Sequence, residues 1–196
     1  MLNLVKKTRT FRIFEQNKEI TDSDLTHLVN LARLGGSAAN CQPWQYMTVK
    51  SKDLCTRIFP FLGWAGYLSD WKGPAEGERP NAYILCFLNK KWLKGSEKLA
   101  YFDLGTASQN LLLGAMEKGI GGCRIGAFSP DLAKIFTLPE HIELHLVIAL
   151  GYPAEEVVLE DLQEEDNIRY WRTEDGIHHV PKRSIDDITV NFPLNP

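Results

Sequence analysis

Residues 36–44 have the side chains best suited to binding a flat ligand with polar edges. They read Gly-Ser-Ala-Ala-Asn-Cys-Gln-Pro-Trp, and the carboxamides are those of Asn40 and Gln42. A backbone that carries small side chains can approach a planar ring closely, and each carboxamide offers hydrogen-bond donors and an acceptor. The same residues are typical of a helix that ends at a glycine and leads into a strand. Other parts of the chain must therefore decide whether this segment binds a ligand or only connects two elements.

Two basic clusters lie near opposite ends of the chain. The residues of the first are Lys6, Lys7, Arg9 and Arg12. The second is Lys182-Arg183, and Thr10 adds a hydroxyl between the two arginines of the first. Arginine and lysine together are common ligands of a terminal phosphate, which has close to two negative charges at neutral pH. Taken alone, each cluster is also typical of a solvated surface.

The glycine-rich segment 119–126 is not a dinucleotide-binding fingerprint. That motif follows a strand and opens a helix, whereas these glycines follow a helical pattern and the sixth position is Arg124. The small residues around Arg124 and Ile125 favour a strand whose backbone passes close to a ligand ring or to another backbone.

The whole chain predicts one domain, residues 1–196, with a C-terminal arm from residue 155. Its net charge of −3 gives no reason to expect a nucleic acid or a membrane as partner. Residues 1–7 have no apolar core of a signal peptide, so we expect a cytoplasmic protein. The four cysteines are far apart and have no closely spaced histidine, which predicts free thiols and no metal site.

Periodicity and capping residues predict helices and strands in alternation. The expected helices cover 22–34, 51–59 and 97–118, with one more from residue 130. The expected strands cover 44–50, 82–88, 121–125 and 143–150. Thr21 should cap the first helix, the strand 82–88 should be buried on both faces, and the helix 97–118 should be central.

Three aromatic residues, Trp64, Tyr67 and Trp71, lie in a long loop that ends near Pro80. Such a loop can act as a lid or a substrate platform, and a local hydrophobic cluster is an equally good interpretation. The arm contains an acidic run: Glu155, Glu156, Glu160, Asp161, Glu164, Glu165 and Asp166. Residues 185–192 regain apolar character and could add a strand to the chain's own sheet or a neighbour's. We assign no chemistry to His178 and His179, and expect His141 and His145 to be structural or surface residues.

Several segments together resemble the nitroreductase-like FMN flavoproteins. They are Arg9–Phe14, Ser37–Trp44, Asp103–Leu113, Gly119–Phe128, Gly151–Pro153 and Val180–Ser184. The resemblance implies an α+β, three-layer fold: a central mixed, mostly antiparallel sheet flanked by helices, and an extended C-terminal arm exchanged in a homodimer.

The resemblance also implies a set of FMN-binding residues. Arg9, Thr10, Lys182 and Arg183 would hold the phosphate and ribityl chain. Arg12 would lie at the pyrimidine edge of the flavin and supply positive charge near N1. Gly36, Ser37, Ala38 and Asn40 would approach a flavin bound mainly by the other subunit, and Asp103, Arg124, Ile125 and Gly126 would contact the ring. Two positions depart from the family, which commonly has arginine where Thr8 stands and proline where Gly36 stands.

The implied activity is an FMN-dependent NAD(P)H oxidoreductase with a ping-pong mechanism. Its acceptor would be a nitroaromatic, a quinone or a similar electron-poor small molecule, stacked on Trp64, Tyr67 or Trp71. The alternatives are dehalogenation or flavin fragmentation on the same scaffold, a non-catalytic flavin-binding protein, and an interaction domain without cofactor.

Overall fold

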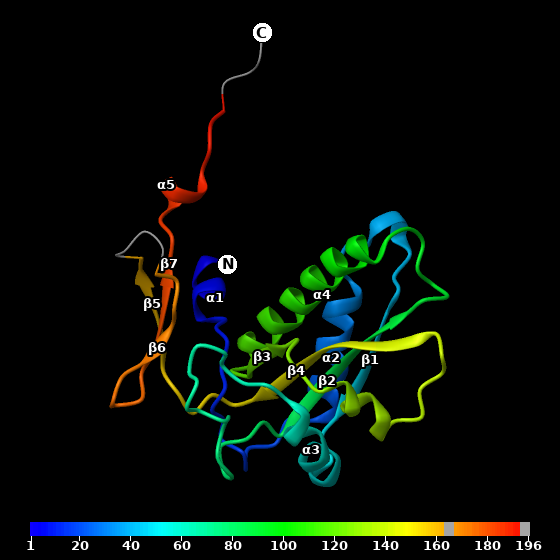
Figure 1. The fold of residues 1–196 in the computed structure, drawn as a ribbon, viewed down its shortest axis with the longest axis horizontal. Coiled ribbons are helices and arrows are strands. Elements are labelled where there is room, and N and C mark those ends of the chain that lie inside the picture. The colour runs from blue at the N-terminus through cyan, green and yellow to red at the C-terminus, as the bar shows by residue number, and fades with distance from the viewer. Residues whose placement is uncertain (163–166, 193–196) are drawn as a thin grey trace.

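A four-stranded sheet lies between two layers of helices in the computed structural model, which describes residues 1–162 and 167–192 (Figure 1). The strands in spatial order are β1 (Trp44–Val49), β2 (Ala82–Asn89), β4 (Ile142–Gly151) and β3 (Gly121–Ile125). All three neighbouring pairs are antiparallel. The predicted mixed character appears only at the β3 edge, where Thr10 forms an isolated parallel bridge with Gly122. Glu164, Glu165 and Asp166 lie outside the described residues.

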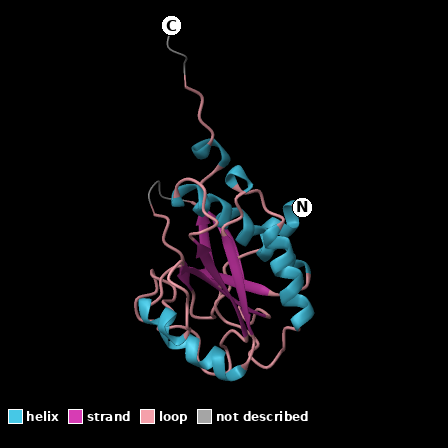
Figure 2. Ribbon diagram, turned by 90° about the vertical axis from the view of Figure 1, so that its right-hand side faces the viewer, coloured by secondary structure: helices cyan, strands magenta, loops and turns pink. Residues whose placement is uncertain are grey.

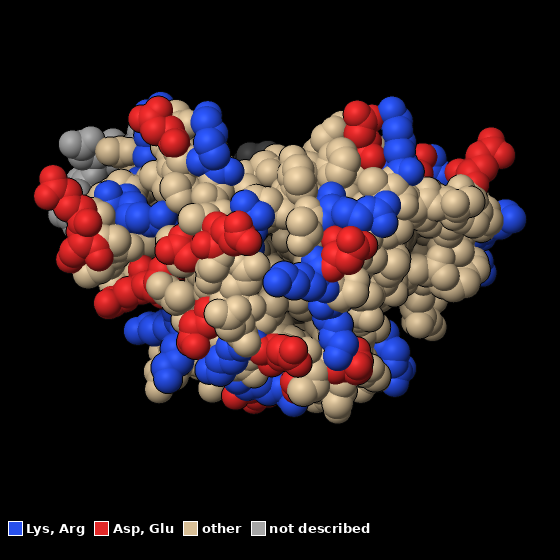
Figure 3. Space-filling model, turned by 90° about the horizontal axis from the view of Figure 1, so that it is seen from below, with Lys and Arg blue, Asp and Glu red and all other residues tan. Residues whose placement is uncertain are grey.

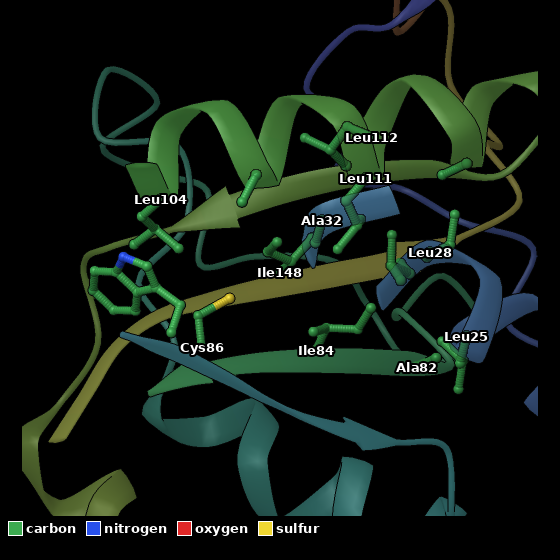
Figure 4. Packing of buried hydrophobic residues seen from close by; sticks show 14 of the residues in the cluster. Leu25, Leu28, Ala32, Ala82, Ile84, Cys86, Leu104, Leu111, Leu112 and Ile148 are labelled. Atoms are coloured by element: carbon green, nitrogen blue, oxygen red, sulfur yellow. The ribbon is translucent and has the colours of Figure 1, made fainter. Parts of the chain in front are cut away.

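Helices α2 (Asp22–Arg33) and α4 (Glu97–Glu117) cover one face of the sheet. Figure 2 shows that helices lie on both sides of the strands. Thr21 caps α2 as predicted, because its hydroxyl accepts from the backbone N–H of Asp24, whose carboxylate accepts from the Thr21 N–H in return. Leucines of both helices meet the even-numbered residues of β2, as Figure 4 shows for Leu28, Leu111 and Ile84. Burial of this face stabilises the fold through the hydrophobic effect.

A shorter layer covers the opposite face. It consists of α3 (Lys52–Ile58) and two 3₁₀ helices, η2 (Phe59–Phe61) and η3 (Pro130–Ile135). The odd-numbered β2 residues Tyr83, Leu85 and Phe87 pack here, so β2 is buried on both faces as predicted. The helix expected from residue 130 is a 3₁₀ helix that ends at Ile135.

Helix α1 (Leu2–Lys7) was not predicted from the sequence. It packs against α4 but buries none of its own residues, so its amphipathic signal is weak.

The arm forms a second, three-stranded sheet. Strand β7 (His178–Lys182) pairs in parallel with β5 (Val157–Asp161) and antiparallel with β6 (Trp171–Arg172). The strand predicted over residues 185–192 does not form within this chain. Instead, Ser184 and Asp187 make a capping box that starts a short helix, α5 (Ile185–Ile188), and the chain then extends away from the rest of the molecule (Figure 1).

The surface carries charges of both signs, interspersed on the face shown in Figure 3. Within residues 1–162 and 167–192, no helix combines the length and the apolar character that crossing a membrane requires. All four cysteines are free thiols, as predicted.

Candidate functional site

Four cationic side chains, brought together from three distant parts of the chain, line one cavity of about 300 Å³. They are Arg9, Arg12, Arg124 and Lys182. The other lining residues are Thr8, Thr10, Gln109, Leu112, Tyr170, His178 and Val180, so none of the described residues in the wall has a carboxylate. We call this space the cationic cavity. A site with several positive charges and no negative one favours an anionic ligand.

The N-terminal segment reaches the cavity because it lies along the edge of β3. Besides the bridge from Thr10, the backbone N–H of Phe11 donates to the Gly122 carbonyl at 3.1 Å. A Cβ atom at Gly122 would come within 2.6 Å of the Leu112 side chain, and one at Gly121 within 2.6 Å of the Phe11 ring. Both positions therefore require glycine for this close packing.

Strand β7 presents alternate residues to the cavity. Side chains of a strand alternate between its two faces, so His178, Val180 and Lys182 share one face, and all three line the cavity. Arg183 follows the strand and does not line the cavity. Of the two residues predicted as the C-terminal phosphate ligands, the structure brings only Lys182 to the N-terminal arginines.

A buried carboxylate joins the N-terminal segment to the arm. Oε1 of Glu155 accepts hydrogen bonds from the backbone N–H groups of Arg12 and Ile13, the latter at 3.0 Å, and Oε2 accepts from Nη2 of Arg172 at 2.7 Å. Only 2% of the Glu155 side chain is exposed. The sequence grouped Glu155 with a run of acidic arm residues, but its role is to fix the backbone that carries Arg12.

His178 holds the Arg12 side chain. Its Nε2 lies 3.3 Å from Nη1 of Arg12, and a guanidinium can only donate, so Nε2 is the acceptor and the ring proton is on Nδ1. The residue is 1% exposed, and Nδ1 has no hydrogen-bond partner among the described residues. Burial, together with the charge of Arg12, lowers the pKa of His178 to about 4. A neutral histidine therefore orients Arg12 without cancelling its charge.

The loop that includes η1 (Ala38–Asn40) lies at a different cavity, of about 340 Å³. Gly36 and Ser37 line this space together with Asp103 of α4, and we call it the loop cavity. The Asp103 carboxylate accepts from the Ser37 hydroxyl at 2.8 Å and from the Ala38 N–H at 3.1 Å. Asp103 thus positions the loop within its own chain, and none of these residues lines the cationic cavity.

The backbone of this loop is unusual. Ala39, Asn40 and Gln42 have φ angles of 50°, 53° and 47°, a region that residues other than glycine rarely adopt. The Asn40 side chain is exposed and accepts from Nε2 of Gln42 at 3.1 Å. Backbone strain of this kind concentrates at binding and catalytic sites, because the surrounding structure must compensate for it.

Strand β3 supplies the other predicted ring contacts. The Arg124 side chain reaches Gln109 of α4 and lines the cationic cavity. Ile125 points into the core, so only its backbone is available to a ligand. A Cβ atom at Gly126 would meet no atom within 4 Å, which leaves the backbone open to close approach.

The three aromatic residues of the loop have different surroundings. Trp64 packs against the core cluster beside Phe59, with their ring centroids 5.8 Å apart. Tyr67 is half exposed, and its ring centroid is 4.9 Å from that of Tyr170, which lines the cationic cavity. Trp71 lies 4.8 Å from the guanidinium of Arg172. Tyr67 thus contacts a residue that lines the cavity but does not line it itself. Trp64 packs against the hydrophobic core.

Comparison with known proteins identifies the chain's relatives. The sequence model of the nitroreductase family matches residues 5–152, which include the N-terminal basic motif, the loop, α4 and β3. The chain belongs to the nitroreductase family. This confirms the family and the α+β fold class that the sequence motifs suggested.

Individual nitroreductase-family relatives are distant but cover most of the chain. A protein of Methanothermobacter thermautotrophicus, named as a candidate NADH dehydrogenase/NAD(P)H nitroreductase, is 28% identical over 176 residues, which cover 86% of this chain and 85% of that protein. The iodotyrosine dehalogenase 1 homolog of Caenorhabditis elegans is 23% identical and covers 82% and 57%, respectively.

Among solved structures, a candidate nitroreductase from Desulfovibrio desulfuricans in complex with FMN has a TM-score of 0.69 at 18% identity. The similarity covers 99% of this chain and 97% of that one. At this identity the likeness concerns the fold.

The nitroreductase-family match ends at residue 152, before the arm begins. Tyr170, His178 and Lys182 therefore lie beyond it, although they line the same cavity as the matched arginines. Sequence reasoning found Lys182 but missed Tyr170, His178 and Glu155. A sequence signal for His178 was available: in a strand, alternate residues share a face, so His178 and Lys182 would lie on the same face.

Proposed function

We propose that this chain is an FMN-dependent oxidoreductase that takes electrons from NAD(P)H and passes them, in a ping-pong mechanism, to a nitroaromatic, a quinone or a similar electron-poor small molecule. The main support for the proposal is the cationic cavity, in which four cations surround one space and none of the described lining residues has a carboxylate. The family membership agrees with this reading, as do the names of the relatives.

The chemistry of the lining residues fits FMN. A terminal phosphate is a dianion at neutral pH, and Arg9, Thr10 and Lys182 offer charge-assisted and hydroxyl hydrogen bonds for it. Two polar atoms of the lining residues, Nε of Arg9 and Nδ1 of His178, have no hydrogen-bond partner among the described residues. A bound ligand would supply the missing partners, as buried polar groups require. When bound, FMN supplies the redox chemistry by accepting two electrons and passing them on.

Arg12 is the candidate for the pyrimidine edge of the flavin. Glu155 fixes its backbone and His178 its guanidinium, so the side chain is oriented before a ligand arrives. Because His178 is neutral at pH 7, the charge of Arg12 remains available to stabilise negative charge on the ring. A carboxylate in place of His178 would hold Arg12 equally well but would offset that charge.

The proposal includes a homodimer in which the loop at 36–44 completes the partner's site. The cationic cavity is at the lower limit of ligand-pocket volumes, so a ligand as large as FMN needs a further wall. Gly36 and Gly126 leave open space around the backbone, as a close approach by ring or partner would require. The arm also exposes apolar side chains that a monomer would leave in water, namely Ile185, Ile188, Val190 and Phe192. A monomer in sedimentation that retains FMN would contradict this arrangement.

The phosphate assignment is tested by comparing FMN with riboflavin. Lys182→Ala should weaken FMN binding about 10-fold or more and leave riboflavin binding unchanged, because only FMN carries the phosphate. Arg183→Ala should have the smaller effect, since Arg183 does not line the cavity. Lys134→Ala, on an exposed side chain of η3, is the matched control. Equal losses for both ligands in Lys182→Ala would refute the assignment.

The reductase assignment is tested by anaerobic stopped-flow mixing of the flavin-loaded protein with NADH or NADPH. Loss of the oxidised flavin absorbance, and its return when a nitroaromatic or a quinone is added, is the expected result. Flavin that stays oxidised would instead support a flavin-binding protein without turnover. Protein that FMN cannot reconstitute would support an interaction domain.

Reductive dehalogenation is the second candidate, favoured by the similarity to the iodotyrosine dehalogenase 1 homolog. Tyr67, in the loop from Trp64 to Pro80, packs on Tyr170, which lines the cationic cavity. The loop is therefore the region that would select the acceptor. Iodide release from iodotyrosine under the same anaerobic conditions, at a rate above that of nitroaromatic reduction, would favour this candidate.

A further inference from the structure

A second large cavity has a volume of about 440 Å³. It is bordered by α3, by the end of the aromatic loop and by residues 16–20, and it shares no lining residue with the cationic cavity. We call it the α3 cavity. Its volume is within the range of small-molecule sites.

Three lining residues have polar atoms without hydrogen-bond partners among the described residues. These atoms are the hydroxyl oxygen of Tyr83, Nε of Arg79 and Oδ1 of Asn81. Tyr83 is fully buried, at 0% exposure. A buried polar group left unpaired costs stability, so three such groups around one cavity need an explanation. In the cationic cavity the same signature, at Arg9 and His178, accompanies the proposed cofactor site.

The charges around the α3 cavity nearly balance. The lining has three cations, Lys50, Lys52 and Arg79, and two carboxylates, Glu19 and Glu76. Lys50 also pairs with a carboxylate outside the lining, that of Asp22, at 2.8 Å. Arg79 makes no ion pair with any acidic residue that the structure describes, and its guanidinium lies 4.2 Å from the centroid of the Phe59 ring. Arg79 is therefore available to pair with one anionic group, whereas the four cations of the cationic cavity favour a dianion.

The remaining wall is apolar. Ile20, Phe59 and Pro80 contribute hydrocarbon surface, and Cys55 contributes a thiol. Burial raises the pKa of Cys55 to about 11, so the sulfur is neutral and adds no charge to the site. A ring of Phe59 under a guanidinium is a suitable surface for a flat apolar group that ends in an anion.

We propose that the α3 cavity is a second ligand site, which binds a small monocarboxylate with a flat apolar body. Arg79 pairs with the carboxylate, Phe59 and Pro80 contact the flat body, and Oδ1 of Asn81 accepts a hydrogen bond from a donor on the ligand. The hydroxyl of Tyr83 gains a partner in the same event. This site does not depend on flavin binding, and its test is independent of the redox activity.

The test measures binding of 4-hydroxybenzoate by isothermal titration calorimetry, with 4-hydroxybenzamide as the neutral probe. The measurement uses protein with saturating FMN, so that a loaded cationic cavity does not compete for the anion. We expect the acid to bind at least about 10-fold more tightly than the amide, and less tightly as the salt concentration rises. Equal affinity for the two probes would overturn the proposal.

Two variants locate the bound anion. Arg79→Gln should reduce the affinity for 4-hydroxybenzoate about 10-fold or more, because it removes the charge that pairs with the carboxylate. Arg57→Gln, on the exposed side of α3 and outside the lining, should have no effect. If Arg79→Gln binds as tightly as the native chain, the ligand is elsewhere and the proposal fails.

Tyr83→Phe keeps the packing and removes only the unpartnered hydroxyl. Without ligand, the variant should be at least as stable as the native chain, because a buried hydroxyl without a partner contributes nothing favourable. Its affinity for 4-hydroxybenzoate should still fall several-fold. A variant that loses stability but keeps its affinity would show that the hydroxyl is structural, and would overturn this part of the site.

Discussion

The three-layer body and the terminal segments are held together in different ways. In the body, leucine and alanine side chains of α2 and α4 pack on the sheet in a continuous cluster (Figure 4). Between the N-terminal segment and the arm, polar contacts come from the Glu155 carboxylate and from the pair of Arg12 with His178. Arg172 of the arm also lies beside Trp71 of the aromatic loop. Most residues that line the cationic cavity come from the N-terminal segment and the arm.

The body therefore provides most of the stability, whereas the terminal segments provide most of the residues for binding. Hydrophobic burial is non-directional and tolerates small shifts, whereas hydrogen bonds and ion pairs fix the direction of each group. Cations that must point at one anion therefore need hydrogen bonds and ion pairs to hold them. The terminal segments should therefore open at lower free energy than the body, and a bound anion should stabilise them preferentially.

The largest effect should come from the body. Leu28→Ala, at a fully buried position between α2 and the sheet, should lower the free energy of unfolding by about 3 kcal/mol. Urea denaturation measures this loss, and Leu34→Ala, at an exposed position after α2, is the control. Hydrogen exchange should show reduced protection throughout the molecule. A loss confined to α2 would contradict the cooperative body.

Glu155→Gln should act mainly on the terminal segments. The substitution keeps an acceptor for the backbone N–H groups of Arg12 and Ile13 but removes the charge that faces Arg172, at an expected cost of about 2 kcal/mol. Hydrogen exchange should increase at residues 10–14 and 171–182 and stay unchanged in β2. Glu156→Gln, at the exposed neighbour, is the matched control. An equal increase of hydrogen exchange in β2 and in the arm would contradict the distinction between the body and the terminal segments.

His178 should make stability depend on pH. Its pKa is about 4 in the folded chain and about 6.5 when exposed, so between these values the unfolded chain binds more protons. The free energy of unfolding should therefore fall as the pH is lowered from about 6.5 to about 4, by at most about 1.4 kcal/mol per pH unit. His178→Gln should reduce that slope, and His27→Gln, at an exposed position, should not. Identical slopes in all three proteins would show that His178 is not held neutral.

The smallest effect should come from the contact between the aromatic loop and the arm. Tyr170→Phe removes the hydroxyl that accepts a hydrogen bond from the Tyr67 backbone N–H at 3.3 Å, at a cost below about 1 kcal/mol. Hydrogen exchange at residues 66–71 should rise locally. If protection there is unchanged, the hydroxyl does not hold the loop, and the ring contacts of Trp64, Tyr67 and Trp71 hold it instead.

The sequence predicted the body well because its signals are local or periodic. Thr21 and Asp24 define a helix start by themselves, and the continuous apolar run of β2 can satisfy only a strand buried on both faces. Residues 185–192, which add no strand to the chain's own sheets, also follow a local signal. Apolar letters suggested a strand, while the capping box of Ser184 and Asp187 determined the local conformation.

The site was predicted in part, because its residues meet through tertiary structure. Arg9, Arg12 and Lys182 have an obvious charge, and the resemblance placed them together. Glu155 looked like one of many acidic arm residues, since nothing in a sequence distinguishes a buried carboxylate from a solvated one before its partner is known. The separation of Ser37 and Asp103 from the cationic cavity also required the fold, because the distance between two cavities is not a local property.

The bridge from Thr10 to Gly122 has a consequence for association between molecules. Strand β3 is at the edge of the central sheet, and an edge with free N–H and carbonyl groups is a template for pairing with another chain. The N-terminal segment occupies part of that edge while it carries arginines to the cavity. A chain that lacks residues 1–10 would therefore lose anion affinity, because Arg9 and Thr10 would be missing. It would also expose unpaired backbone groups of β3, so aggregation would accompany the loss of binding.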